Sequence, residues 1–188
     1  MKRMLIGGLV GGLAVYIWSF ISHMVLPIGS AGISIIQQNE DVVLETMKTN
    51  ISEPGLYFIP GIDPNTDMSS EAYKTWEEKY KTGPRGLLLF NPEGADPMSI
   101  GQLLTELLTN LIAGIIAAFL LFSLIGSYWI RVYTVTLLGL FSWISISASY
   151  WNWYGFPGSF IVAEGIDQVI GWFLAGIVMA KIVKVKAL

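Results

Sequence analysis

The chain has 188 residues, of which 53% are hydrophobic and only 13% are charged. Soluble domains carry roughly 25% charged residues, so this composition indicates membrane spans rather than a soluble domain with a large core. The absence of cysteine excludes disulfides, thiolate metal sites, iron–sulfur clusters and covalently attached haem within the chain. A pI near 5.1 argues against nucleic acid as a partner.

Four apolar segments are each long enough to cross about 30 Å of hydrocarbon as a helix that rises about 1.5 Å per residue. They are Met4–Pro27, Gly101–Gly126, Tyr128–Tyr150 and Ser159–Val183. They predict an all-α membrane bundle of four transmembrane helices, with the N-terminal tail and first span in residues 1–27 and the other three spans in residues 101–188. A cleaved signal peptide is the alternative interpretation of the first span. We expect this span to stay in the mature protein, because it is longer than the apolar core of an ordinary signal peptide.

The basic residues indicate the orientation of the spans. With an even number of spans, the basic residues outside the long central segment all fall on one side, which the positive-inside rule identifies as the cytoplasm. Both termini are therefore expected to be cytoplasmic, and residues 28–100 are expected to face outward. The six basic residues in question are Lys2, Arg3, Arg131, Lys181, Lys184 and Lys186.

Residues 28–100 contain the signals of a small α/β extramembrane cap. Asn39 can cap a helix over Glu40–Asn50, and Pro54-Gly55 separates this helix from a short strand, 56–59. The order then recurs: Ser69 or Ser70 caps a helix over Glu71–Thr82, and Gly83-Pro84 precedes a strand, 87–90. We expect two helix–strand units that pair their strands into a compact cap; a duplicated binding module is the alternative.

Ionisable side chains within spans are costly and usually face the bundle interior, which makes them the strongest functional lead. At helical spacing and similar depth, six polar residues are expected to converge in the outer half of the bundle: His23, Glu106, Asn110, Glu164, Asp167 and Gln168. We favour hydrogen-bonded contacts that hold the helices together; a proton or cation site and a metal centre are the alternatives. A single histidine supports zinc, di-iron and bis-histidine haem sites poorly, so we expect neither a metal nor a cofactor.

Small residues at four-residue spacing allow helices to approach closely in lipid. Gly8 and Gly12 in the first span and Gly171 and Ala175 in the fourth follow this pattern. The sequence leaves open whether these faces pack within the bundle or against another subunit.

Aromatic residues are dense between the third and fourth spans, where residues 150–158 are expected to form an external turn. Trp151, Trp153, Tyr154 and Phe156 are candidates for an interfacial aromatic belt, which anchors helices at the membrane surface. The alternative is a docking surface for a partner protein, a quinone or a pigment tail.

Five stretches carry a resemblance to a known family. They are GGLVGGLAVYIWSFISHMVLP (7–27), WEEKYKTGPRGLLLFNPEGADPM (76–98), ELLTN (106–110), WNWYGFP (151–157) and DQVIGWFLAG (167–176). With them the chain resembles an uncharacterised family of bacterial four-helix integral membrane proteins with a periplasmic loop domain. The resemblance implies location in the bacterial cytoplasmic (inner) membrane and an outward-facing loop domain. It implies no catalytic residue.

The sequence favours a non-catalytic accessory or scaffold subunit of a larger bacterial membrane complex. It shows no nucleophile–base pair, phosphate-binding loop or convincing metal set, whereas packing motifs and aromatic docking residues are abundant. The expected partners are the lipid bilayer and other membrane-protein subunits, with a quinone or lipid contact at the outer interface. The alternative is a small transporter or proton- or cation-conducting protein that uses Glu106, Glu164 and Asp167; a membrane enzyme comes third.

Overall fold

The computed structural model describes residues 1–184, so the basic residue Lys186 lies outside the described part. The chain divides into two compact units, each described by itself. Residues 1–33 and 97–184 form the helical unit, and residues 34–96 form the small unit.

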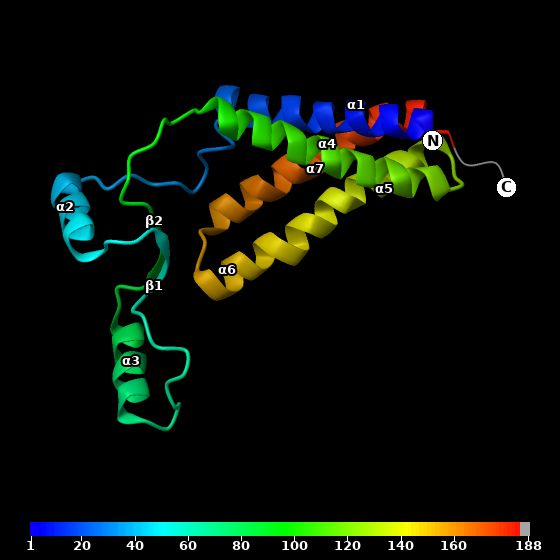
Figure 1. Cartoon of the computed structure of the whole chain (residues 1–188). Helices are drawn as coiled ribbons and strands as arrows, with labels where there is room; N and C mark the ends of the chain where they lie inside the picture. The colour runs from blue at the N-terminus through cyan, green and yellow to red at the C-terminus, as the bar shows by residue number, and fades with distance from the viewer. Residues whose placement is uncertain (185–188) are drawn as a thin grey trace. The chain divides into compact units, whose positions relative to one another are not determined.

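The helical unit contains four long helical segments (Figure 1). All four are long and apolar enough to cross a membrane, which agrees with the four predicted spans and supports a multi-pass membrane protein. The first is α1 (Lys2–Phe20), which continues as a π-helical turn, Ile21–Val25, and the second is α4 (Ile100–Ser123). The third runs through α5 (Tyr128–Ser142), a π-helical turn (Trp143–Ser147) and α6 (Ala148–Tyr154); the fourth is α7 (Gly158–Ile182).

The four segments do not close into a symmetric bundle. α1 packs along both α4 and α7, and α5 packs along α7, whereas α4 makes only slight contact with α5 and α7. α4 and α5 are joined by a short loop and diverge away from it (Figure 1). We call the end of the unit that holds Lys2, this loop and Ile182 the terminal end, and the opposite end the distal end.

Glycines allow the backbones of α1 and α4 to meet directly. A Cβ atom added at Gly8 would lie 2.6 Å from the Cα atom of Ile115, and one added at Gly12 would lie 2.7 Å from the Cα atom of Leu111. Gly7 and Gly11 of the same helix face α7 instead. The small-residue faces of α1 are therefore used for packing within the chain, which is one of the two alternatives that the sequence left open.

The fourth helix shows the same use of small residues. Gly171 lies against Trp18 of α1, Gly176 lies against Val132 of α5, and Ala175 is fully buried. Towards the terminal end, apolar side chains close the space between the helices. The main buried members of this core are Met4, Val15, Ala117, Ala118, Leu121, Val135, Ala175, Met179 and Val183.

Arg131 has a structural role that its sequence position does not suggest. The sequence identified it only as one of the basic residues that set the orientation, but its side chain is 7% exposed. The guanidinium donates to the backbone carbonyls of Ala180 (3.4 Å) and Val183 (2.7 Å), and the Tyr128 hydroxyl donates to the carbonyl of Ile177 (3.1 Å). A cation at the C-terminus of α7 satisfies carbonyls that have no partner in the helix and is favoured by the helix dipole.

The aromatic segment before α7 differs from the predicted nine-residue turn. α6 continues to Tyr154, and Gly155, with φ 74°, ends the helix in the left-handed conformation that favours glycine. Trp151, Trp153 and Tyr154 therefore lie on a helix, where all three are exposed, and only residues 155–157 form the turn. The third helical segment therefore ends at Tyr154 and not at Tyr150, where the sequence predicted the span to end.

The small unit contains α2 (Glu40–Asn50), β1 (Gly55–Ile59), α3 (Glu71–Thr82) and β2 (Gly86–Phe90). The two strands pair antiparallel with Leu56 opposite Leu89, which confirms the predicted pairing of two helix–strand units. Ser70 caps α3 by accepting a hydrogen bond from the Tyr73 amide. Asn39 precedes α2 as predicted, but its side chain makes no capping hydrogen bond. None of the residues from 34 to 96 is buried.

We predict that Gly12→Ala destabilises the helical unit. The added methyl group would overlap the backbone of α4, and such overpacking costs about 1–3 kcal/mol. Gly158→Ala is the matched control, because a Cβ at this helical position meets no atom within 4 Å. Since alanine is the better helix former by about 1 kcal/mol, the control should be neutral or stabilising. Thermal unfolding of the two variants in detergent micelles measures the difference, and equal melting temperatures would contradict the close contact.

We predict that the start of α3 loses stability in acid. The backbone N–H and then the hydroxyl of Ser69 donate to the Asp67 carboxylate, each at 2.8 Å, and lower the pKa of this carboxyl below its ordinary value of 3.8. A lowered pKa in the folded state gives stability that is present above pH 3.8 and is lost as the pH falls through the folded-state pKa. Asp67→Asn should therefore shift the NMR resonance of the Tyr73 amide towards its unfolded position at pH 7 and have no effect at the lowest pH. A titration midpoint of Asp67 at or above 3.8 would contradict this.

Candidate functional site

The divergence of α4 from α5 leaves an open polar cleft between the helices, towards the distal end. The cleft consists of two adjoining cavities of about 430 and 440 Å³, which share Ser19, Glu106, Glu164, Asp167 and Gln168. The first cavity also reaches Asn110, and the second reaches His23. The structure therefore places all six predicted polar residues on one cleft. That these six residues form a functional site stays a prediction.

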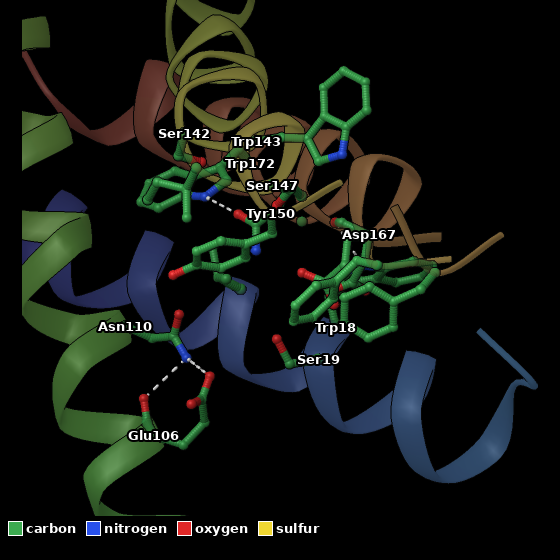
Figure 2. A pocket seen from close by; sticks show the side chains of 17 residues that line it. Trp18, Ser19, Glu106, Asn110, Ser142, Trp143, Ser147, Tyr150, Asp167 and Trp172 are labelled. Carbon is green, nitrogen blue, oxygen red and sulfur yellow. Dashed lines mark hydrogen bonds between the residues drawn. The ribbon is translucent and has the colours of Figure 1, made fainter. Parts of the chain in front are cut away.

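Each of the helical segments contributes a different part of the cleft wall (Figure 2). α4 supplies Glu106 and Asn110, which lie one helical turn apart, and α1 supplies Trp18 and Ser19. α5 supplies Ser142, and the π-helical turn and α6 that follow it supply aromatic residues, including Trp143 and Tyr150. α7 supplies the remaining polar groups. Its spacing of three and four residues places Glu164, Asp167, Gln168 and Gly171 on the cleft side of the helix.

Glu106 is held by its neighbour on the same helix. The side-chain amide of Asn110 donates to the Glu106 carboxylate at 2.6 Å and to the Glu106 backbone carbonyl at 2.9 Å (Figure 2). His23 is also held locally, since its Nδ1 lies 2.9 Å from the Ser22 hydroxyl and 3.1 Å from the Ser19 carbonyl. These contacts stay within single helical segments, so they do not connect α1 or α4 to another helix. They therefore do not support the interpretation of Glu106 and His23 as contacts that hold helices together.

Asp167 differs from the other carboxylates of the cleft because one of its two carboxylate oxygens is buried without a hydrogen-bond partner. The residue is 6% exposed, and its Oδ1 atom has no hydrogen-bond partner. Its backbone carbonyl accepts a hydrogen bond from the Trp18 indole at 3.1 Å, but this contact does nothing for the carboxylate. A buried carboxylate is costly unless it is protonated or compensated by a cation. Asp167 is therefore the residue at which an additional group would be most strongly favoured.

Three tryptophans around the cleft are fixed through their indole N–H groups. Trp18 donates to the Asp167 carbonyl, Trp143 donates to the Ile161 carbonyl at 2.8 Å, and Trp172 donates to Gln168 Oε1 at 3.2 Å. All three acceptors belong to α7. Because the N–H edges are occupied, the orientation of each ring is set by the protein before any ligand arrives.

The cleft also holds residues that were not among the six predicted polar residues. Ser142, Ser147 and Tyr150 line it, whereas the Ser145 hydroxyl donates to the Phe141 carbonyl on its own helical segment. The π-helical turn at Trp143–Ser147 interrupts the regular α-helical spacing, so the face on which these residues lie could not be predicted from periodicity. The tryptophans had no specific signal, because aromatic residues are common throughout the spans.

The arrangement is suited to binding positive charge. Three carboxylates and one imidazole line the cleft, and the described residues that form its walls include neither lysine nor arginine. Among residues 1–184, no group of three or more His, Cys, Asp or Glu side chains is placed to hold a metal ion.

The four aromatic residues that the sequence proposed for docking do not lie together on the cleft. Phe156 lines the first cavity, whereas Trp151, Trp153 and Tyr154 do not.

No family model, curated protein or solved structure matches the chain. The resemblance to a family of bacterial four-helix membrane proteins, which the sequence motifs suggest, therefore stays a prediction.

We predict opposite effects for two neutralising substitutions in the cleft. Asp167→Asn should raise the melting temperature of the ligand-free protein, because it removes the charge from a buried side chain whose Oδ1 has no partner, and an unsatisfied buried group costs more when it is charged. Glu106→Gln should be nearly neutral, because the new amide oxygen can still accept from Asn110. Thermal unfolding in one detergent provides both values. A clear loss of stability in Asp167→Asn would show that this carboxylate holds the helices together.

Proposed function

We propose that the chain is a non-catalytic accessory subunit of a larger complex in the bacterial inner membrane, with both termini in the cytoplasm and the small unit outside. The observation that carries this proposal is the lack of a buried core in residues 34–96. A unit of this kind gains its stability by being covered, and a partner subunit provides such a cover.

The surface of the small unit supports the proposal. Leu56 and Leu89 form a cross-strand pair that remains 64% and 83% exposed. The helix α2 also leaves Val42 and Leu44 exposed, and the chain has no cysteine that could link these elements. A two-stranded sheet is marginally stable in water by itself, and exposed apolar patches mark interaction surfaces. An apolar partner surface on the sheet would bury the leucine pair.

The exposed aromatic residues of α6 offer a second contact of the same kind. Trp151, Trp153 and Tyr154 have large apolar rings and polar N–H or O–H groups. Such side chains suit the outer surface of the inner membrane as well as a protein surface. In the proposed complex they anchor this end of the subunit beside its partner. A quinone or lipid contact at these residues remains compatible with the same role.

A small transporter or proton- or cation-conducting protein is the second candidate, and the polar cleft favours it. The three carboxylates Glu106, Glu164 and Asp167 lie on a cleft that is open, as a site of ion entry would require. However, the terminal half of the helical unit is filled by the apolar core, in which Leu121, Val135 and Met179 are fully buried. Conduction would require this core to open, so the accessory role accounts for more of the structure.

The accessory role predicts that the purified chain and its native complex differ in the small unit. Hydrogen exchange of the chain alone should show little protection in residues 34–96 and strong protection in α7, whereas the complex extracted in mild detergent should protect both. Leu89→Lys should reduce recovery of the complex by roughly tenfold, because a charge would face the partner's apolar surface. Gln38→Lys, at an exposed polar position of the same unit, is the control and should leave recovery unchanged.

Two results would contradict the accessory role. One is full protection of residues 34–96 in the isolated chain, which would show that the unit needs no partner. The other is ion or proton movement by the pure protein in vesicles that is lost in Asp167→Asn, which would establish the transporter instead.

A further inference from the structure

The Asp167 carboxylate has one buried oxygen that no other group of the described structure satisfies. It is more than nine-tenths buried, its Oδ1 atom has no partner, and the residue lines both cavities of the polar cleft. Figure 2 shows it beside Trp18, on the side of the cleft opposite Glu106 and Asn110. A positive group close by would compensate a buried negative charge of this kind, which is otherwise costly unless it is protonated. The chain itself supplies no lysine or arginine among the described residues of the cleft walls.

The other polar groups of the cleft define the charge of the ligand. Glu164 lies one turn from Asp167 on α7, and Glu106 faces them from α4. Three carboxylates without a lysine or arginine disfavour a phosphate or carboxylate group on the ligand, because like charges in a medium of low polarity repel strongly. The cleft therefore selects a net cation rather than an anion.

The size and the aromatic walls define the body of the ligand. A cavity of about 430 Å³ falls in the range of roughly 300–1,000 Å³ that small-molecule sites occupy, which is far larger than a bare metal ion needs. Trp18, Trp143 and Trp172 are fixed by hydrogen bonds through their N–H edges, and Tyr150, Phe156 and Phe160 also line the cavity. Aromatic faces attract organic cations and pack well against apolar groups.

We propose that the polar cleft binds an organic cation with an apolar body. Its positive group lies at Asp167 and Glu164, and its apolar part lies against the aromatic wall formed by Trp143, Tyr150, Phe156 and Phe160. This ligand site is independent of the accessory role, which rests on the small unit. The positive group could belong to a free amphiphilic cation or to the ammonium of a lipid headgroup.

A pair of probes with the same shape and opposite charge tests the proposal directly. Tetraphenylphosphonium and tetraphenylborate are titrated into the full-length protein in phosphatidylglycerol nanodiscs, and equilibrium dialysis against empty nanodiscs corrects for partition into lipid. Saturable binding of tetraphenylphosphonium alone, at one site per chain, is expected. Saturable binding of both ions, or of neither, would overturn the proposal without the need for any variant.

Matched variants identify the site. Asp167→Asn should weaken tetraphenylphosphonium binding by about tenfold or more, because it removes one opposite charge from a site of low polarity. Glu164→Gln should weaken it in the same direction and serves if the first variant does not fold. Glu93→Gln makes the same change of charge at an exposed position of the small unit and should leave the affinity unchanged. An equal effect of all three variants would mean that only the overall charge matters, which would overturn the site.

The same titration in nanodiscs of a different lipid composition distinguishes a free cation from the ammonium of a lipid headgroup. In nanodiscs that contain phosphatidylethanolamine, competition by the headgroup would lower the apparent affinity for tetraphenylphosphonium in the wild type. Such competition assigns the site to a lipid ammonium, and an unchanged affinity assigns it to a free cation. The result does not depend on whether residues 34–96 bind a partner, so failure of this inference and failure of the accessory role can be told apart.

Discussion

The helical unit depends on the direct contact of helix backbones at glycine. In a membrane, lipid chains are as apolar as the side chains that they replace, so helices associate through close packing and hydrogen bonds rather than through the hydrophobic effect. Gly8 and Gly12 bring α1 against α4, while Gly7 and Gly11 bring the opposite side of α1 against α7. α1 is thereby held between two helices, and the positions of all the cleft residues on α1, α4 and α7 follow from this arrangement.

α7 is the second organising element, because it accepts hydrogen bonds from the segments around it. Indole and phenol groups of α1, α5 and the π-helical turn donate to its backbone, and Arg131 satisfies carbonyls at its end. α4 makes no such contact with α5, and the two helices diverge. The cleft is thus the space left where one pair of neighbours lacks a packing surface, and aromatic and acidic side chains line it. A sealed bundle would have buried Glu106 and Glu164 further and made their charges costlier.

The sequence predicted the features that depend on local pattern. The apolar lengths located the four spans, and the capping and turn residues located α2 and α3 with the bounds that the structure shows. It could not predict features that depend on tertiary contact. No local signal distinguishes Arg131 at a helix end from an ordinary cytoplasmic arginine, or shows which helix faces Gly12. The sequence also could not predict which residues near Trp143–Ser147 face the cleft, because periodicity arguments assume an uninterrupted α-helix and this segment contains a π-helical turn.

The structure also changes the basis of the accessory role. The sequence favoured that role partly because small-residue faces are abundant, but Gly8, Gly12, Gly171 and Ala175 are occupied by contacts within the chain. They no longer support association with another subunit. The surfaces that remain are chemically different: an apolar leucine pair on the small unit, an aromatic helix α6, and an acidic cleft. A partner subunit would recognise the leucine pair and α6 through apolar burial, whereas a positive group would compensate the acidic cleft. This difference is the reason to treat the partner and the cleft ligand as separate molecules.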